Sequence, residues 1–253
     1  MLIDRDMCLG CGECRPYCIV GAISIKDEEA YIDQDECLEC GSCLRTKACP
    51  VNAIYMPTLE WPRVLREQFS NPVARHPKTK MGGRGTEEVK TNEVTGRIQC
   101  GQIGIAVEMG RPGIGTTFRE VEKVSRALSP LGVEWEKANP LTTLFDLETG
   151  VFREDVLDER VLSCILECII PRKKVEKVLS VLQKVAPTLD TVFSLGFVST
   201  YAPDGTLPGL DIVRLLGYEP RSNYKFNLGM GRPLFVENNG VNREVGPDDT
   251  YSA

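Results

Sequence analysis

Histidine is almost absent from this chain of 253 residues, in which His76 is the only one. It could act as the base of a catalytic triad only if a nucleophile packed against it, and nothing in the sequence marks one. The sequence also lacks a P-loop, a dinucleotide-binding fingerprint, a zinc-hydrolase motif and the protein-kinase motifs. We therefore predict no familiar catalytic centre, and we expect His76 to lie in a surface loop.

Long apolar runs are missing as well. No stretch approaches the length of a membrane-spanning helix, and the first six residues do not provide the apolar segment of a secretory signal. No stripe of basic residues interleaved with aromatic residues is present, which disfavours nucleic-acid binding. We expect a soluble, cytoplasmic protein, because free thiols in this number need a reducing compartment, and an anaerobic setting would protect oxygen-sensitive groups.

Acidic residues are concentrated at one end of the chain. Residues 1–60 carry eleven Asp or Glu and five Lys or Arg, whereas the remainder carries twenty-five of each kind. The whole formal charge of −6 therefore lies in the N-terminal segment. Such a charge keeps a small domain soluble, and it also steers an electron carrier toward basic patches on a partner.

Cysteine is abundant: the chain has eleven, and eight of them fall in two runs within the first fifty positions. Three cysteines separated by two residues each fit on one tight loop around three corners of an iron–sulfur cube, and a fourth usually ligates the other cluster. This spacing predicts two [4Fe-4S] clusters. Cluster one is assigned to Cys8, Cys11, Cys14 and Cys49, and cluster two to Cys37, Cys40, Cys43 and Cys18.

With this spacing in tandem, residues 1–57 resemble the bacterial two-cluster ferredoxins. The residues after each fourth cysteine also repeat, since Ile-Val-Gly-Ala-Ile follows Cys18 and Pro-Val-Asn-Ala-Ile follows Cys49. The resemblance implies an internal duplication with pseudo-two-fold symmetry. Two features depart from the family: Ile19 replaces the usual proline after Cys18, and five residues rather than three separate Cys43 from Cys49.

Disulfide bonds or zinc could also account for a cysteine-rich segment. A disulfide framework needs an oxidising compartment, for which no signal is seen. Zinc usually takes paired Cys-x-x-Cys knuckles rather than triples followed by a fourth cysteine. Iron–sulfur clusters are therefore the favoured interpretation.

Three cysteines remain outside the two runs: Cys100, Cys164 and Cys168. Cys164 and Cys168 are four apart in a predicted strand, so both point to one side of it. A thiol pair or metal site would be conceivable if Cys100 lay across from them. Free cysteine is commonly a buried core residue, which is the favoured interpretation here.

The chain is expected to be an α+β protein with two units. We place an iron–sulfur domain at residues 1–57, a connector at 58–96, an α+β domain at 97–201, and a C-terminal arm with a disordered tail at 202–253. Residues 97–201 read as strand, helix, strand, strand, helix, strand, which is the split βαβ pattern also called ferredoxin-like. We predict a four-stranded antiparallel sheet with both helices on one face and with the strands at 97–109 and 161–170 in the centre.

Two observations hint at binding partners. The strand at 161–170 has apolar residues on both faces, with Ile165 and Ile169 on one face and Cys164, Leu166, Cys168 and Ile170 on the other. Cover could come from the cluster domain, the C-terminal arm or another subunit, and we favour a homo-oligomer or a complex. Gly-Arg-Pro occurs twice, so Arg111 and Arg232, with Thr116 and Thr117 beside the first copy, could line a site for a small anionic ligand.

The sequence favours an electron-transfer protein that passes single electrons between its clusters and a redox partner protein. An alternative is a ligand-binding or regulatory module whose clusters are structural or sense redox state. A third is an enzyme, such as a reductase or sulfur-handling protein that uses Cys100, Cys164 or Cys168. The absence of a catalytic motif makes an electron-transfer component the first choice.

Overall fold

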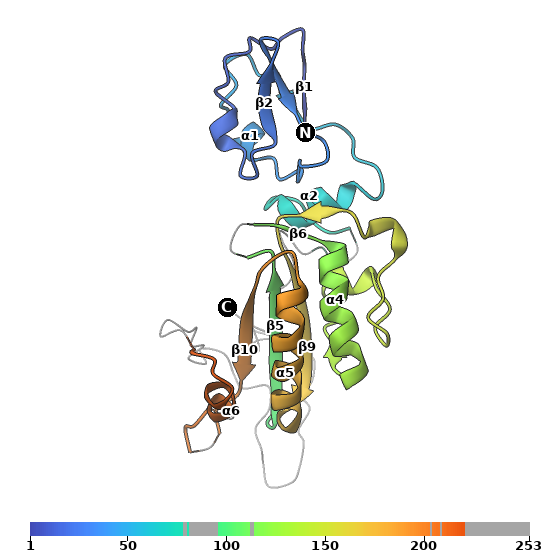
Figure 1. Cartoon of the computed structure of the whole chain (residues 1–253), viewed down its shortest axis with the longest axis vertical. Helices are drawn as coiled ribbons and strands as arrows, with labels where there is room; N and C mark the ends of the chain where they lie inside the picture. Colours follow the sequence, from blue (N-terminus) through green and yellow to red (C-terminus); the bar gives the residue numbers. More distant parts are fainter. Residues whose placement is uncertain (78–79, 81–95, 112–113, 203, 208, 221–253) are drawn as a thin grey trace, which may run out of the picture.

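The computed structural model describes residues 1–77, 80, 96–111, 114–202, 204–207 and 209–220. A small cysteine-rich unit lies at one end of an elongated molecule, and a larger unit built on one sheet forms the rest (Figure 1). Within the described residues, none of the helices combines the length and the apolar character that spanning a membrane requires.

The small unit consists of two short antiparallel strand pairs and two short helical turns. Its core contains Ile23, Ile32 and Ile54 together with buried cysteines. Strand β1 pairs with β4, which brings the two ends of the unit together, and β2 pairs with β3. The elements are β1 (Leu2–Ile3), the 3₁₀ helix η1 (Arg15–Tyr17), β2 (Ile23–Lys26), β3 (Glu29–Ile32), α1 (Ser42–Arg45) and β4 (Ile54–Tyr55).

The larger unit is organised around a four-stranded antiparallel sheet in the order β10-β5-β9-β7. The two strands predicted to be central are central, and β5 and β9 pair along their whole length from Gln102↔Pro171 to Met109↔Cys164. A smaller pair, β6 with β8, lies beside the sheet. The strands are β5 (Gln102–Met109), β6 (Thr116–Thr117), β7 (Glu134–Trp135), β8 (Arg160–Val161), β9 (Cys164–Pro171) and β10 (Phe193–Ser199).

Helices α4 (Phe118–Leu128) and α5 (Val175–Val185) lie on the same face of this sheet (Figure 1). Alternate residues of the strands and the apolar stripes of both helices share one buried core, because side chains repeat every second residue in strands and every three to four in helices. A short helix, α6 (Leu210–Leu215), follows the sheet and ends before Gly217. The 3₁₀ helices are η3 (Ser129–Leu131), η4 (Pro140–Thr143), η5 (Glu154–Val156), η6 (Arg172–Lys174) and η7 (Ala186–Thr188).

The opposite face of the sheet is also buried. Ile165 and Ile169 are 1% and 7% exposed within the single chain, so no second subunit is needed to cover them. The face is not wholly apolar, because Glu167 lies between them and is fully buried, with its carboxylate accepting a hydrogen bond from the Asn139 amide at 2.9 Å. Formation of an oligomer stays a prediction.

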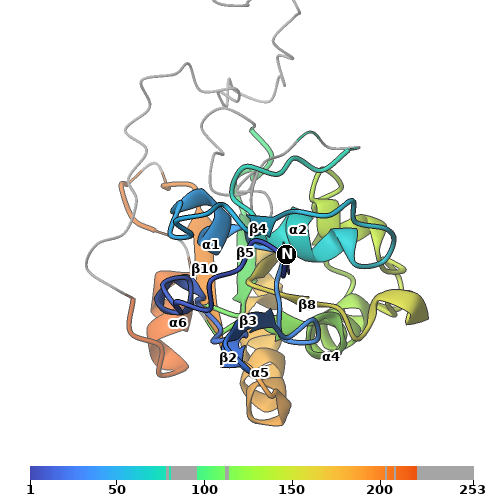
Figure 2. The same ribbon diagram turned by 90° about the horizontal axis from the view of Figure 1, so that it is seen from above.

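Helix α2 (Val64–Ser70) connects the two units within the predicted connector. Leu65 and Phe69 point into the core of the larger unit. Arg66, on the same helix, reaches the small unit and donates to the carbonyl oxygens of Gln34, Asp35 and Cys37, each at 3.0 Å. Seen from above, the small unit sits over α2 and the strand end of the larger unit (Figure 2).

One local expectation was wrong. His76 is 7% exposed rather than lying on the surface, and its carbonyl oxygen accepts a hydrogen bond from the Lys80 amide. Thr117 precedes α4 without capping it through its side chain, and Glu120 in the first turn pairs with Lys123 and accepts from the Asp190 amide. The C-terminal tail and the second Gly-Arg-Pro, with Arg232, lie outside the described residues.

Candidate metal centre

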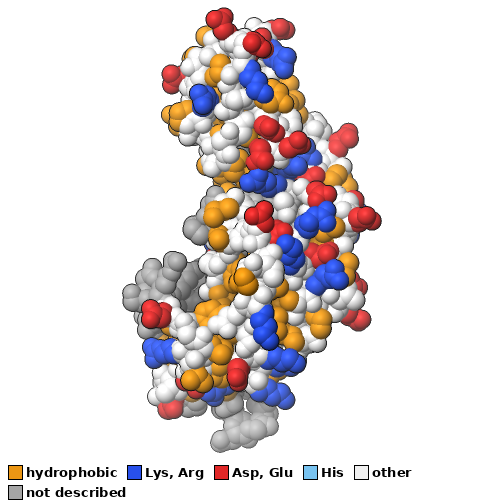
Figure 3. All heavy atoms as spheres, viewed as in Figure 1, with side chains coloured by type: hydrophobic (Ala, Val, Ile, Leu, Met, Phe, Trp, Pro, Cys, Tyr) orange, Lys and Arg blue, Asp and Glu red, His pale blue; other side chains and the backbone are white. Residues whose placement is uncertain are grey.

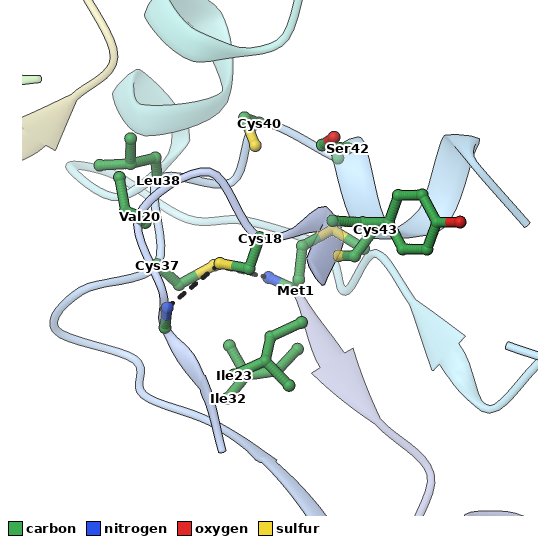
Figure 4. A pocket seen from close by; sticks show the side chains of 13 residues that line it. Met1, Cys18, Val20, Ile23, Ile32, Cys37, Leu38, Cys40, Ser42 and Cys43 are labelled. Carbon is green, nitrogen blue, oxygen red and sulfur yellow. Dashed lines mark hydrogen bonds between the residues drawn. The ribbon is translucent and has the colours of Figure 1, made fainter. Parts of the chain in front are cut away.

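Two separate pockets in the small unit are each lined by four cysteines. One pocket contains Cys18, Cys37, Cys40 and Cys43, and apolar side chains including Ile23, Ile32 and Leu38 complete its wall (Figure 4). The other contains Cys8, Cys11, Cys14 and Cys49 beside Ile3, Leu9 and Ile54. Each pocket therefore combines three cysteines from one run with the last cysteine of the other run.

Glycines allow both loops to wrap their pockets. Gly12 and Gly41 follow the second cysteine of each run and have φ values of +76° and +68°. A side chain strongly disfavours this left-handed conformation, whereas glycine adopts it freely. The chain therefore turns tightly after the second cysteine of each run.

Backbone amides donate to several thiol sulfurs. The Ala22 amide donates to Cys18 Sγ at 3.1 Å, and the Ala53 amide donates to Cys49 Sγ at 3.2 Å. Both contacts join a residue to the cysteine four positions before it, so the duplicated sequence produces a duplicated contact. The Ala30 amide lies 3.4 Å from Cys8 Sγ. Donors aimed at sulfur stabilise thiolate, which is one of the means by which a protein adjusts the potential of an iron–sulfur cluster.

Burial has the opposite effect on the thiols. Desolvation raises the pKa of Cys14 and Cys40, and it raises the pKa of Cys43 to about 11, with neighbouring cysteines adding repulsion. Four thiolates in one apolar pocket are therefore unfavourable without a cation. Iron supplies this charge when it is bound, so the donor set fits a group that carries positive metal ions and takes four sulfur ligands.

Buried and half-buried charged side chains surround the second loop. Glu39 is fully buried between Cys37 and Cys40, and its carboxylate accepts from Arg63 Nε at 2.8 Å and contacts the amino group of Met1. Arg45 donates to the carbonyl oxygen of Cys40 and to the side chain of Asn71, both at 2.7 Å. None of these positions stands out in the sequence, because each contact joins residues from separate parts of the chain.

The three remaining cysteines are not brought together. Cys164 and Cys168 are buried in the core between sheet and helices, as the favoured interpretation required, and burial raises the pKa of both, to about 12 for Cys168. Cys100 is exposed, just before β5. In the antiparallel register, the start of β5 faces Pro171 at the far end of β9, away from Cys164.

The first Gly-Arg-Pro loop does not present a free arginine. The guanidinium of Arg111 donates to the Glu108 carboxylate at 2.9 Å, and Ser194 donates to the same carboxylate at 3.0 Å. The hydroxyl of Thr116 donates to the carbonyl oxygen of Thr117. Arg111 is therefore already paired with a carboxylate of its own strand end.

Among the described residues, no three His, Cys, Asp or Glu side chains are arranged to hold a single metal ion.

Comparison with known proteins identifies one segment. Residues 1–24 match the family model of the 4Fe-4S binding domain. No curated protein matches the chain, and no solved structure does. The N-terminal region is therefore a 4Fe-4S binding domain that binds an iron–sulfur cluster, and the remainder of the chain has no assigned family.

Proposed function

We propose that this protein is an electron-transfer component that holds two [4Fe-4S] clusters and passes single electrons to or from a partner oxidoreductase. Cluster one would be held by Cys8, Cys11, Cys14 and Cys49. Cluster two would be held by Cys37, Cys40, Cys43 and Cys18. The observation that carries the proposal is the grouping of these cysteines into two pockets of four.

The arrangement favours electron transfer over a purely structural role. The two pockets belong to one small unit of about fifty residues and share its core, so both clusters would lie within one compact body. The protein groups that surround them, thiolates, backbone amides and apolar side chains, are those that set a cluster potential.

Metal and sulfide analysis with electron paramagnetic resonance tests the proposal. An anaerobically purified sample should contain about eight iron and about eight acid-labile sulfide per chain. Reduction by dithionite should produce a spectrum with two interacting cluster signals. A sample with zinc and without iron would exclude the proposal, and about four iron per chain with a single signal would reduce it to one cluster.

The partner is proposed to be a separate protein that binds the acidic unit. The chain would then act as a subunit of, or a carrier for, an oxidoreductase complex, and the larger unit would serve as the structural attachment. A ligand-controlled module is less well supported, because the arginine that suggested an anion site is paired with Glu108.

A further inference from the structure

The two cysteine runs provide matched positions at which the surroundings of each cluster can be compared. Leu9 and Leu38 each follow the first cysteine of a run. Leu9 is 65% exposed, whereas Leu38 is 1% exposed. Because the spacing of the two runs is the same at this point, the difference must come from what packs on each loop.

Helix α2 accounts for the covered loop. Arg66 donates to the carbonyl oxygen of Cys37 at 3.0 Å, and Arg63 donates to the carboxylate of Glu39 at 2.8 Å. These contacts lie on either side of Leu38 in the sequence. The chain therefore covers the second loop with a helix that presents arginines around an apolar residue.

The first loop has no such cover among the described residues. Met7 and Leu9 are exposed, and so is Cys11, a member of the first cysteine set. Strand β2 points away from the larger unit, so the turn that follows it and the first loop beside that turn lie at the far end of the small unit (Figure 1). Nothing in the described part of the larger unit blocks access from this end.

Acidic side chains outnumber basic ones around the exposed loop. Gly10 lies directly against the backbone of Glu28. The exposed charged residues of the neighbouring segments are acidic at Asp6, Glu13, Asp27 and Glu28 and basic at Arg5, Arg15 and Lys26. The space-filling view shows acidic, basic and hydrophobic side chains together at this end of the molecule (Figure 3). An apolar centre whose surroundings carry a net negative charge is complementary to an apolar contact ringed by basic side chains.

We propose that the first loop, residues 7–11, is the docking surface through which cluster one exchanges electrons with a partner protein, and that the partner presents an apolar contact surrounded by Lys or Arg. The inference rests on the proposed function and assigns a direction to it: cluster one faces the partner, and cluster two faces the larger unit. In each transfer one electron leaves the reduced cluster and lowers the oxidation state of the acceptor by one, and no proton moves.

Cytochrome c, a basic one-electron acceptor, is a suitable probe. The full chain is loaded anaerobically, reduced with dithionite, freed of excess reductant and mixed with ferric cytochrome c in a stopped-flow instrument. Leu9→Lys and Leu9→Ala are compared with Leu215→Lys, which makes the same charge change at a leucine that is 85% exposed on the larger unit. Leu44→Lys probes the side of the second loop, next to Cys43.

At low ionic strength we expect the second-order rate constant to fall at least tenfold in Leu9→Lys and about threefold in Leu9→Ala. The Leu215→Lys and Leu44→Lys variants should stay within twofold of the parent protein. Added salt should slow the parent protein, because screening weakens attraction between opposite charges. Iron content and spectra of each variant show whether both clusters are retained.

Three results would overturn the proposal. The first is a Leu9→Lys protein with full iron content that reacts as fast as Leu215→Lys, and the second is that Leu44→Lys is the slow variant. The third is that Leu9→Lys converts a dimer to a monomer in sedimentation, which would make the loop a self-association surface. A parent protein without iron or without a signal on reduction would instead refute the proposed function itself, so the two failures are distinguishable.

Discussion

The two cysteine loops have the same spacing and the same left-handed backbone at one matched position, where they carry different residues. Gly10 precedes the second cysteine of the first run with φ +61°, and Glu39 occupies the matching position with φ +52°. A side chain in this conformation costs on the order of 1 kcal/mol, and glycine avoids that cost. Glu39 is retained there with a buried carboxylate bonded to Arg63.

The comparison shows where a duplicated sequence diverges. Residues that wrap the pockets, such as Gly12 and Gly41, stay equivalent because the geometry of both loops depends on them. Other residues of the loops follow their neighbours: Leu38 and Glu39 are buried where the larger unit attaches, and Leu9 remains exposed. The two halves of the small unit therefore differ because the larger unit attaches at the second loop. Their sets of four cysteines remain equivalent.

The largest effect should come from removing one cysteine of each set. Cys14→Ser should lose cluster one and Cys43→Ser cluster two, each lowering the iron content by about half, because each cluster needs its own four thiolates. Cys100→Ser is the matched control, since this cysteine is exposed and distant from both pockets. Iron analysis and electron paramagnetic resonance measure the outcome; a loss of both clusters from either variant would contradict independent sites.

Arg66→Met should give the next largest effect, and it should fall on the second loop. Removing a buried arginine leaves three carbonyl oxygens of the small unit and the Glu159 carboxylate without their donor. Breaking a buried ion pair from one side destabilises by about 3–5 kcal/mol. That corresponds to a decrease of roughly 10 °C in the melting temperature of a chain of this size.

The matched control for this variant is Arg153→Met. Arg153 is more than half exposed and pairs with Asp155 and the Trp61 ring at the surface. Redox titration should show that Arg66→Met shifts the potential of cluster two more than that of cluster one. Equal shifts, or none, would argue against a special link between α2 and the second loop.

Exchanging the residues at the left-handed position should have smaller effects of unequal size. A Cβ atom on Gly10 would lie 1.9 Å from the carbonyl oxygen of Glu28, so Gly10→Ala should destabilise the protein by about 2–3 kcal/mol. Glu39→Gly relieves backbone strain but removes the carboxylate that Arg63 binds, so a net loss of about 1–2 kcal/mol is expected. Thermal unfolding followed by cluster absorbance measures both; a more stable Gly10→Ala protein would refute the close contact.

The smallest effect distinguishes the core thiols from the pocket thiols. Burial raises the pKa of Cys164 and Cys168 above the ordinary value of 9.0, so the unfolded chain loses these protons first as the pH rises. Stability from these groups is intact below pH 9 and decreases above it, up to about pH 12 for Cys168. The slope is about 1.4 kcal/mol per pH unit and per thiol.

Urea unfolding of the parent protein and of a Cys164→Ala/Cys168→Ala variant at pH 8, 9 and 10 tests this. The variant should be less stable at pH 8 because it loses buried volume, and it should lose less stability between pH 9 and 10. Parallel pH profiles would show that the two thiols do not contribute.

Much of this architecture could be predicted from the sequence. The order of strands and helices along residues 97–201 predicted β5 and β9 and their central places, and the cysteine spacing predicted which thiols would share a pocket. Periodicity could not reveal Glu167, because a single buried carboxylate in a strand depends on Asn139, a distant residue. The same limit applied to His76, whose burial depends on neighbours that no local pattern specifies.

The segment that forms the bridging helix α2 was predicted only as part of a connector. Its role depends on opposite faces: Leu65 and Phe69 enter one core, while Arg63 and Arg66 bind the other unit. A short amphipathic segment is visible in the sequence, but the partners of its charged face are largely backbone carbonyls, which carry no sequence signal.

Any fragment that ends at the boundary after residue 57 would lack these arginines. Leu38 would become accessible to water in such a truncated product, and the Glu39 carboxylate would lose the guanidinium that now binds it. A recombinant piece carrying the cysteines alone would therefore differ from the intact chain at its second loop, and it should extend through Asn71 to keep that loop in its native setting.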